Sequence, residues 1–408
     1  MPSFSIAMSG LQADSVALNT IGNNLANLNT TAFKGQTTSF EDLFYQQVGT
    51  SGANDALQVG VGTKVSGTAT NYQQGTLTNT GNSTDMALSG NGFFVVQQGG
   101  VQSLTRAGNF QMDSYGNLET VSGEQVMGYG AVNGVVTGGG TLGPLQLPIG
   151  QTEAAQATQN FAITANLNAG AATGTQFSTP VTTYDSLGQV HQATISYTKT
   201  AANTWDYSVT LPAGDATGAT GNTGTLTFDT SGNLVTPTSN VAGISFTGLA
   251  DGASDMSVNW NLRDASGTAT IGQSTAASAS TATAQDGYAS GVYESFGVDS
   301  AGVVTASFSN GNTMAVGQLA VASVTNQEGL IITGNNDYQT TASSGVASIG
   351  VAGAGGRGTI EDDTLEQSNV DIATEFSNLI VAQRSFEANS KTVTTFDTIT
   401  QDTISMIR

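Results

Sequence analysis

The chain has 408 residues, of which 30 are acidic and 9 basic, so its formal net charge at pH 7 is −21. Such a charge argues against nucleic acids and anionic membrane surfaces as partners, because like charges repel. The chain has no cysteine, which excludes disulfides and thiolate metal sites. Only 10% of residues are charged and glycine is abundant, a composition more typical of an extracellular structural protein than of an enzyme.

Residues 3–28 are predicted to form an amphipathic helix. Apolar side chains recur seven residues apart in one row and three residues away in a second, which is the spacing of a coiled-coil seam. Only Asp14 interrupts the second row, and polar turn formers at residues 27–30 predict the helix end. The side chains expected to drive assembly from this helix are Phe4, Leu11, Leu18, Ile21, Leu25 and Leu28.

The segments between the two chain ends are rich in short, strand-like runs separated by glycine and asparagine. We expect a linker domain with short strands over residues 31–76, and an inner β domain over residues 77–147 and 286–363. Residues 148–285 are long enough for a separate, inserted outer β domain. The low-complexity run 273–286 is predicted to be a connector.

One four-residue pattern recurs between the strand-like runs, an aspartate followed three residues later by glycine. Aspartate at the first turn position accepts hydrogen bonds from backbone N–H groups ahead of it, and glycine at the fourth adopts a left-handed conformation. We therefore predict hairpin tips; calcium loops are the weaker alternative, since each turn offers one carboxylate. The aspartates are Asp113, Asp185, Asp229, Asp264 and Asp299.

Residues 370–407 are predicted to form the second terminal helix, with Ser368 and Asp371 at its start. Its apolar row also repeats every seven residues and is interrupted only by Thr400. Both terminal segments contain many weak helix formers, so we expect them to be largely disordered in the free subunit and to order on assembly. Two helices of an ordinary buried bundle are the alternative. The expected assembly residues are Ile372, Phe376, Leu379, Phe386, Val393, Phe396 and Ile407.

The sequence offers little for catalysis. His191 is the only histidine, and it begins an alternating run that is typical of one face of a strand. Residues 353–358 fit G-x-G-x-x-G as a string, but acidic residues and no predicted helix follow them, so we expect a flexible loop. No catalytic residue, metal or cofactor is therefore expected.

Several motifs resemble those of the axial proteins of the bacterial flagellum, the rod, hook and hook-associated family. Residues 21–34 resemble the N-terminal signature and residues 365–386 the C-terminal one, while residues 60–63, 74–77, 89–94, 105–110, 123 and 126–129 match in the family's order. Ala32 and Asp363 stand where the family commonly has glycine. The matching motif residues are Asn23, Asn24, Asn27, Asn29, Phe33, Lys34, Gly75, Gly92, Phe93, Ser368, Asn369 and Asp371.

The resemblance implies a mainly β fold with long terminal α-helices. Residues 1–30 and 364–408 would form a helical, coiled-coil inner domain, and the β-rich domains would be built from discontinuous segments. The implied function is a homopolymeric, curved helical tube that acts as a flexible joint and transmits motor torque to the filament. The insertion at 148–285 favours a hook-type member, because the family's rod proteins lack a large outer insertion.

The resemblance also implies partners: the distal rod, the hook cap, the hook–filament junction proteins and the flagellar export apparatus. We expect no nucleic acid partner, no membrane insertion and an extracellular location. Residues 1–33 lack the features of a Sec signal, so export is expected by another route. The alternatives are a distal rod protein with an unusual insertion, a surface-layer or adhesin-type β protein, and a secreted hydrolase that would use His191.

Overall fold

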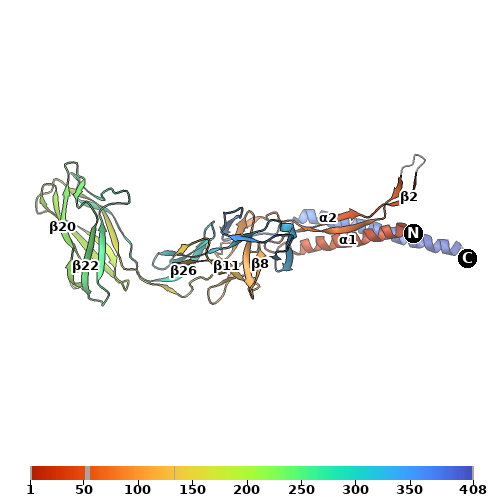
Figure 1. The fold of residues 1–408 in the computed structure, drawn as a ribbon, viewed down its shortest axis with the longest axis horizontal. Helices are drawn as coiled ribbons and strands as arrows, with labels where there is room; N and C mark the ends of the chain where they lie inside the picture. Colours follow the sequence, from red (N-terminus) through yellow and green to blue (C-terminus); the bar gives the residue numbers. More distant parts are fainter. Residues whose placement is uncertain (1, 51–55, 133, 407–408) are drawn as a thin grey trace. The chain divides into compact units, whose positions relative to one another are not determined.

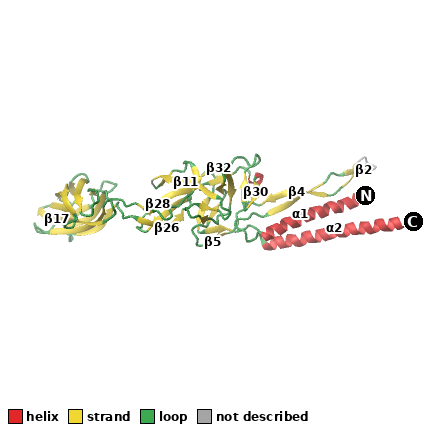
Figure 2. Ribbon diagram, turned by 90° about the horizontal axis from the view of Figure 1, so that it is seen from below, coloured by secondary structure: helices red, strands yellow, loops and turns green. Residues whose placement is uncertain are grey.

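The computed structural model describes residues 2–50, 56–132 and 134–406, and it is mainly β with a helix towards each end of the chain (Figures 1 and 2). The helices are α1 (Pro2–Ala26) and α2 (Ile372–Met406), with a short 3-10 turn, η1 (Gln327–Gly329), between them. The predicted fold class is confirmed. Within the described ranges, no helix combines the length and the apolar character that a membrane span needs.

The chain divides into two compact units. Unit 1 contains residues 1–149, 296–306 and 314–408, and unit 2 contains residues 150–295 and 307–313. The strands that lie within unit 1 are β1 (Gln36–Asp42), β2 (Gln46–Thr50), β3 (Ala56–Val59), β4 (Thr63–Thr70), β5 (Leu77–Asn79), β6 (Met86–Ser89), β7 (Phe93–Gln98), β8 (Val101–Thr105), β9 (Gln111–Met112), β10 (Leu118–Glu119), β11 (Gln125–Val132), β12 (Val135–Val136), β13 (Leu142–Pro144), β29 (Val321–Ser323), β30 (Ile331–Gly334), β31 (Asp337–Gln339), β32 (Ser348–Gly350), β33 (Thr359–Asp362) and β34 (Thr364–Glu366).

Unit 2 is built from the inserted part of the sequence. Its strands are β14 (Thr152–Glu153), β15 (Asn160–Asn168), β16 (Gln176–Tyr184), β17 (Val190–Ala201), β18 (Thr204–Thr210), β19 (Ala216–Thr220), β20 (Thr223–Phe228), β21 (Leu234–Thr236), β22 (Val241–Leu249), β23 (Met256–Asn261), β24 (Ile271–Ser274) and β25 (Ala279–Gln285). Strands β26 (Gly291–Val298), β27 (Val303–Phe308) and β28 (Thr313–Leu319) have residues in both units.

Two sheets of unit 2 share one apolar core. The first has the strand order β16-β17-β18-β20-β21, and the second has the order β19-β22-β23-β15-β24, with β25 also paired to β15. Alternation directs every second side chain inward, and the predicted face of β17 is confirmed because His191, Ala193, Ile195 and Tyr197 are all buried. Both tryptophans of the chain, Trp205 and Trp260, are fully buried in this core.

The β part of unit 1 is a sheet in which β11, β7, β8, β31 and β30 follow one another. Phe93 is buried in its core, with its ring centroid 5.4 Å from that of Tyr338. Two short strand pairs, β33 with β6 and β34 with β5, join the segment before α2 to the segment after β4. Strands from distant parts of the sequence therefore complete one body.

A long hairpin lies along α1. Strand β1 pairs antiparallel with β4, and β2 pairs with β3 beyond them. The Thr38 hydroxyl donates a hydrogen bond to the Thr20 hydroxyl (3.0 Å), and the Thr63 N–H donates to the Ser9 hydroxyl (3.2 Å). The sequence predicts disordered ends in the free subunit, but both ends are helical in the structure of the single chain. The reason is that α1 packs on this hairpin and on α2 within the same chain, and such packing stabilises a helix.

The five aspartate-to-glycine turns have the predicted geometry. In each of them, one carboxylate oxygen accepts hydrogen bonds from the backbone N–H groups two and four residues ahead. The glycine at the fourth position has φ between +82° and +88° in all five. In each turn the backbone N–H groups thus engage one carboxylate oxygen, which agrees with hairpin tips.

One local prediction is wrong and another is right only in part. The run 273–286 is not a connector: its residues 279–285 form β25, an exposed strand, because β15 supplies an antiparallel partner and threonine favours extended backbone. Helix α2 is capped by Asp371 and not by Ser368, since Asp371 Oδ1 accepts the Thr374 N–H at 2.7 Å. Asn369 is hydrogen-bonded to the neighbouring chain segments, so the helix begins after it.

The two positions at which the sequence departs from the family's glycine are both in the left-handed region. Ala32 has φ of 55° and Asp363 has φ of 53°. Ala32 is fully buried, and its N–H donates to the Glu366 carbonyl at 2.8 Å. Left-handed backbone costs an L-residue about 1–2 kcal/mol, and aspartate tolerates it better than alanine does.

Ala32→Gly is therefore expected to be about 1–2 kcal/mol less destabilising than Ala87→Gly, because only the first change relieves backbone strain. Both alanines are buried in unit 1, and Ala87 is not among the residues with positive φ. The free energy of unfolding in urea, followed by far-ultraviolet circular dichroism, measures the difference. Equal costs would show that Ala32 is not strained.

Candidate functional site

Helices α1 and α2 lie side by side (Figure 2), and small or polar residues make specific contacts between them. A Cβ atom on Gly10 would lie 2.7 Å from Asn389 Nδ2. Asp14 Oδ2 accepts hydrogen bonds from Ser385 Oγ (3.0 Å) and Asn389 Nδ2 (2.8 Å). Asp14, the interruption of the predicted apolar row, thus fixes the register of the pair, since sliding by a turn would remove its donors.

Because this contact uses small and polar groups, large apolar side chains of α2 remain exposed. Phe376 is 51% exposed although it lies on a well-formed helix. Large apolar side chains that the single chain leaves exposed indicate a surface that a partner covers. We call the exposed large apolar side chains of α2 the exposed apolar row: Ile372, Phe376, Ile380, Val381, Phe386, Ile399, Ile404 and Met406.

The predicted assembly residues of α2 fall into two groups. Ile372, Phe376 and Phe386 belong to the exposed apolar row, whereas Leu379, Val393 and Phe396 are half-buried. Ile407 lies outside the described residues. The predicted row thus does not lie on one face of the contact. The reason is that Ala382, Ser385 and Asn389, which are not in that row, face α1.

On α1, Phe4 is exposed and Leu11, Leu18, Ile21 and Leu25 are half-buried. Leu28 is half-buried too, but it lies in the turn beyond the helix end. Among the described residues, sequence reasoning missed seven exposed large apolar residues on the two helices, because they lie outside the predicted seven-residue rows. A search for apolar residues outside those rows would have found them: Met8, Val16, Ile380, Val381, Ile399, Ile404 and Met406.

A groove with a volume of about 460 Å³ lies between α1, α2 and β1. Ala17 and Ile21 of α1, Phe40 of β1 and Val381 of α2 contribute apolar surface to its lining. A second set of exposed apolar side chains lies on β2, on β3 and in the segment just before β2, where Phe44 is 93% exposed. The other members of that set are Tyr45, Val48, Leu57 and Val59.

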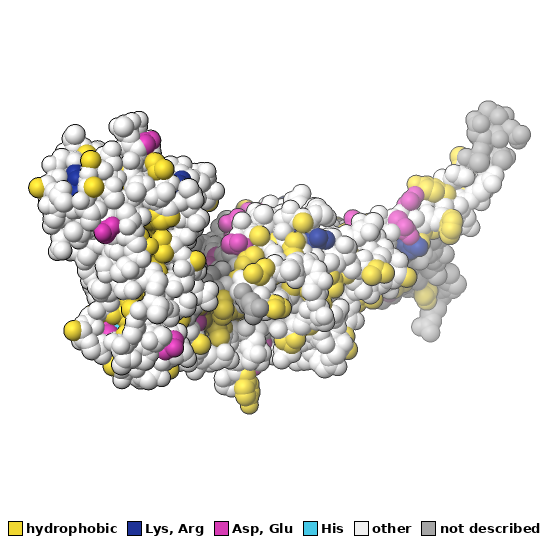
Figure 3. Space-filling view, turned by 60° about the vertical axis from the view of Figure 1, so that its left-hand side comes forward, with side chains coloured by type: hydrophobic (Ala, Val, Ile, Leu, Met, Phe, Trp, Pro, Cys, Tyr) yellow, Lys and Arg dark blue, Asp and Glu magenta, His cyan; other side chains and the backbone are white. Residues whose placement is uncertain are grey.

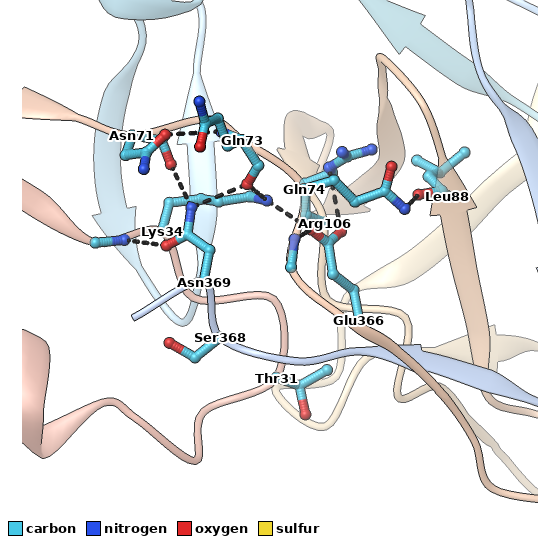
Figure 4. A network of polar contacts seen from close by, with 12 residues as sticks. Thr31, Lys34, Asn71, Gln73, Gln74, Leu88, Arg106, Glu366, Ser368 and Asn369 are labelled. Carbon is cyan, nitrogen blue, oxygen red and sulfur yellow. Dashed lines mark hydrogen bonds and ion pairs between the residues drawn. The ribbon is translucent and has the colours of Figure 1, made fainter. Parts of the chain in front are cut away.

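A buried ionic junction joins the helical end of unit 1 to its β part (Figure 4). Lys34 Nζ lies 2.6 Å from Glu366 Oε1, and Arg106 Nε lies 3.5 Å from Glu366 Oε2. All three side chains are at least 95% buried. Burial lowers the pKa of the Lys34 ammonium below its ordinary value, although the hydrogen bond from Lys34 to Glu366 opposes that shift.

Further polar contacts surround this junction. The Gly75 N–H donates to Glu366 Oε1 at 2.8 Å, and a Cβ atom on Gly75 would lie 2.0 Å from the Gln367 carbonyl oxygen. Asn369 accepts the Gly35 N–H and donates to the Asn71 and Gln73 carbonyls. The motif residues Lys34, Gly75 and Asn369 are thus brought together with Glu366 and Arg106, which were not among the predicted site residues.

The other motif residues have local roles. Asn24 is buried and exchanges hydrogen bonds with the backbone of Gln36, while Asn23 and Asn27 bond each other near the end of α1. Asn29 is exposed in the following turn, and the Phe33 carbonyl accepts the Asn369 N–H. Gly92 has φ of 135°, and a Cβ atom there would lie 2.7 Å from Val321, beside the buried Phe93. The Ser368 hydroxyl accepts a local hydrogen bond from the Val370 N–H.

The visible surface is mostly uncharged and polar, with few basic side chains (Figure 3). Residues 353–358 form a turn between strands and precede β33. His191 is 5% exposed. In the part of the chain that the structure describes, its ion-pair partners are all aspartates. The geometry therefore points to assembly through the terminal helices as the main candidate function.

Known protein families match this chain at both ends and in the middle. Four family models match: a flagella basal body rod protein model at residues 4–34, the flagellar hook protein FlgE/F/G D1 domain at 87–166, the flagellar basal body protein FlaE D2 domain at 157–288, and the flagellar basal body rod FlgEFG protein C-terminal model at 362–406. Unit 2 thus contains the whole of the matched D2 domain.

Curated relatives match over nearly the whole chain. The flagellar hook protein FlgE of Escherichia coli K12 is 35% identical over 97% of this chain and 98% of its own length. The chain belongs to the flagellar hook protein FlgE family. The FlgE of Treponema pallidum is 33% identical over the full length of both chains, and that of Salmonella typhimurium is 34% identical over 97% of this chain.

A solved structure shares the fold. The Helicobacter pylori flagellar hook protein FlgE2 covers 71% of this chain and 100% of its own, with a TM-score of 0.56 at 16% identity. The FlgE family is one of structural subunits and not of enzymes. Membership therefore confirms the predicted structural role over the rod, surface-layer and hydrolase alternatives.

Proposed function

We propose that this chain self-assembles into the flagellar hook, a curved tube that serves as a flexible joint between motor and filament. The observation that carries the proposal is the exposed apolar row on α2, since the contact between α1 and α2 leaves it uncovered. The occupant we propose for this row, and for the groove of about 460 Å³ beside it, is the terminal helices of neighbouring copies. Burial of apolar surface there contributes about 25 cal/mol per Å².

We assign a separate role in the tube to each of the four predicted domains. Residues 1–30 and 364–408 form the inner helical tube, and residues 31–76 link it to the inner β domain of residues 77–147 and 286–363. Residues 148–285 lie outermost. The helical seams transmit torque because they bury apolar surface, whereas the outer domains, rich in glycine, threonine and asparagine, meet through polar contacts that exchange easily as the tube bends.

The partners we propose rest on family membership. The hook subunit continues the distal rod, grows beneath a hook cap and is followed by the hook–filament junction proteins. The subunit reaches its place outside the cell through the flagellar export apparatus. The exposed hairpin of β2 and β3 supplies a further contact to neighbouring subunits, because Phe44 and Tyr45 lack cover in the single chain.

Electron microscopy of the purified chain tests the proposal. At high concentration we expect tubes, and polymer yield is expected to rise with salt, because screening over about 10 Å at 0.1 M weakens the repulsion between subunits of charge −21. Sedimentation of polymer at several sodium chloride concentrations measures the yield. Monodisperse particles at every concentration, or a yield that falls with salt, would contradict the proposal.

A further inference from the structure

Four ionisable side chains meet at one edge of unit 2, apart from the assembly surface. Asp185 lies in the turn between β16 and β17, and His191 is the second residue of β17. Asp215 lies just before β19, and Asp251 lies just after β22. Since β17 and β22 belong to different sheets, this cluster joins the two sheets that share the apolar core.

The cluster has the spacing of metal ligands. His191 Nε2 lies 3.2 Å from Asp185 Oδ2 and 3.6 Å from Asp251 Oδ2, and all three atoms lie within 4.8 Å of one another. Tetrahedral Zn²⁺ with bonds of about 2.0–2.2 Å places its ligand atoms about 3.3–3.6 Å apart. The two distances from His191 Nε2 therefore match or nearly match the edges of such a tetrahedron, and the two carboxylate oxygens are close enough to share one ion.

Local hydrogen bonds hold these ligand atoms in place. Asp185 Oδ1 accepts the N–H groups of Leu187 and Gln189, and Asp251 Oδ1 accepts the N–H of Ala253, so each backbone turn fixes one oxygen. The second oxygen of each carboxylate faces His191. In the comparable turns at Asp113 and Asp229, the side chain of an asparagine four residues ahead donates a hydrogen bond to that second oxygen. At Asp185 the residue in this position is Gln189, and the second oxygen contacts His191 instead.

The other imidazole nitrogen is also engaged. His191 Nδ1 lies 3.1 Å from Asp215 Oδ2. A carboxylate on the outer nitrogen of a metal-binding histidine fixes its tautomer and ring orientation, and makes the other nitrogen a better ligand. Asp215 has the position of such an orienting group.

The charge balance of the cluster favours a cation. Among the described residues, His191 is the only basic group in an ion pair with Asp185, Asp215 or Asp251. Three carboxylates around one imidazole leave excess negative charge even when the histidine is protonated, and Asp185 and His191 are buried. A divalent ion with a neutral histidine reduces that excess more than a proton does.

We propose that this cluster binds one divalent transition-metal ion, of which Zn²⁺ is the probe. His191 Nε2, Asp185 Oδ2 and Asp251 Oδ2 are the ligands, and Asp215 orients the imidazole. Asp251 is solvent-exposed, so the ion has a path of entry and a fourth position for water. The bound ion clamps the turn before β17 to the turn after β22 and stiffens unit 2, independently of whether the chain polymerises.

Zinc titration of the full-length, untagged monomer tests this site. After EDTA treatment and dialysis, calorimetry is expected to give one Zn²⁺ per chain. Thermal unfolding of unit 2 is expected to shift upward by about 5 °C when free zinc is about a hundredfold above its dissociation constant. Tryptophan fluorescence reports unit 2 alone, because Trp205 and Trp260 both lie in it.

Four variants separate the roles. Asp251→Asn and His191→Gln are expected to lower zinc affinity at least about tenfold, and Asp215→Asn by about 10–100-fold, since an orienting carboxylate has that effect. Asp264→Asn is the matched control, because Asp264 caps an equivalent turn in unit 2 with no histidine contact. It is expected to bind zinc as the unchanged chain does.

Two results would overturn the site. The first is unchanged zinc affinity in the Asp251→Asn variant. This variant must unfold, by tryptophan fluorescence without metal, at the same temperature as the parent. The test then stays valid even if His191→Gln fails to fold. The second is equal affinity for Mg²⁺ and Zn²⁺, because a hard cation prefers oxygen ligands alone and equal affinity would mean nonspecific attraction to acidic groups. Neither readout depends on polymer formation, so failure here leaves the assembly proposal standing.

Discussion

Replacing Phe376 and Ile380 together by serine is expected to raise the critical concentration for tube formation about a hundredfold. Each side chain is 51% exposed in the single chain, so about half of its surface is still available for burial in a polymer. Burying two half-exposed large apolar side chains is worth about 2–3 kcal/mol, and 1.4 kcal/mol corresponds to a factor of ten. Sedimentation of polymer across a concentration series measures the shift.

The same double variant is expected to leave the monomer unchanged. Helix content by circular dichroism and the unfolding midpoint should match those of the parent, because the two side chains lie on the uncovered face of α2. Gln383→Ser with Ala388→Ser is the control, since both residues are exposed on the same helix and neither is large and apolar. An unchanged critical concentration in the Phe376 and Ile380 variant would rule out this row as the assembly surface.

Glu366→Gln is expected to destabilise unit 1 by about 3–5 kcal/mol at pH 7, because it leaves Lys34 and Arg106 buried without their counter-charge. The substitution keeps the shape of the side chain, so packing loss contributes little. Circular dichroism during urea unfolding is expected to show an earlier transition for unit 1. Tryptophan fluorescence is expected to stay unchanged, since both tryptophans lie in unit 2.

Raising the pH should restore part of that loss. The folded-state pKa of Lys34 is lowered, so folding favours the neutral amine, and stability increases as pH rises through that lowered value. Without the Glu366 charge the pKa falls further, and the gap between variant and parent should narrow from pH 7 to pH 9.

Glu41→Gln is the matched control for Glu366→Gln. Glu41 pairs with Lys64 at the same 2.6 Å distance but at an exposed position, so no measurable change is expected. Equal effects of the two substitutions, or a gap between the Glu366 variant and the parent that widens with pH, would show that the buried junction does not hold unit 1 together.

The sequence predicted what depends on local periodicity. The terminal helices follow from the spacing of apolar residues, and the turns at Asp113 and Asp229 follow from one aspartate and one glycine three residues apart. The buried face of β17, which contains His191 and Tyr197, follows from alternation. In each case the physical cause lies within a few residues of its effect.

The rest depends on contacts between distant segments. The role of Asp14 requires the register of α2, which supplies Ser385 and Asn389 from the other end of the chain. Residues 279–285 form a strand only because β15 offers them a partner. The carboxylates around His191 come from three separate turns, so no residue spacing in the sequence predicts that they meet.

The predicted site was incomplete for a similar reason. Lys34 and Gly75 were named as site residues, but Glu366, which lies in the C-terminal signature 365–386 and accepts hydrogen bonds from both, was not. A buried lysine requires a buried acid, and its position more than 300 residues away is set by the pairing of β34 with β5.

The placement of Glu366 also sets an order of events during synthesis. Lys34, Gly75 and Arg106 are all made early, yet the carboxylate that pairs with Lys34 and Arg106 and accepts the Gly75 N–H stands near the other end of the chain. Because synthesis runs from the N-terminus, this junction cannot form until residue 366 has been made. The helical end and the β part of unit 1 are therefore joined only when nearly the whole chain is available.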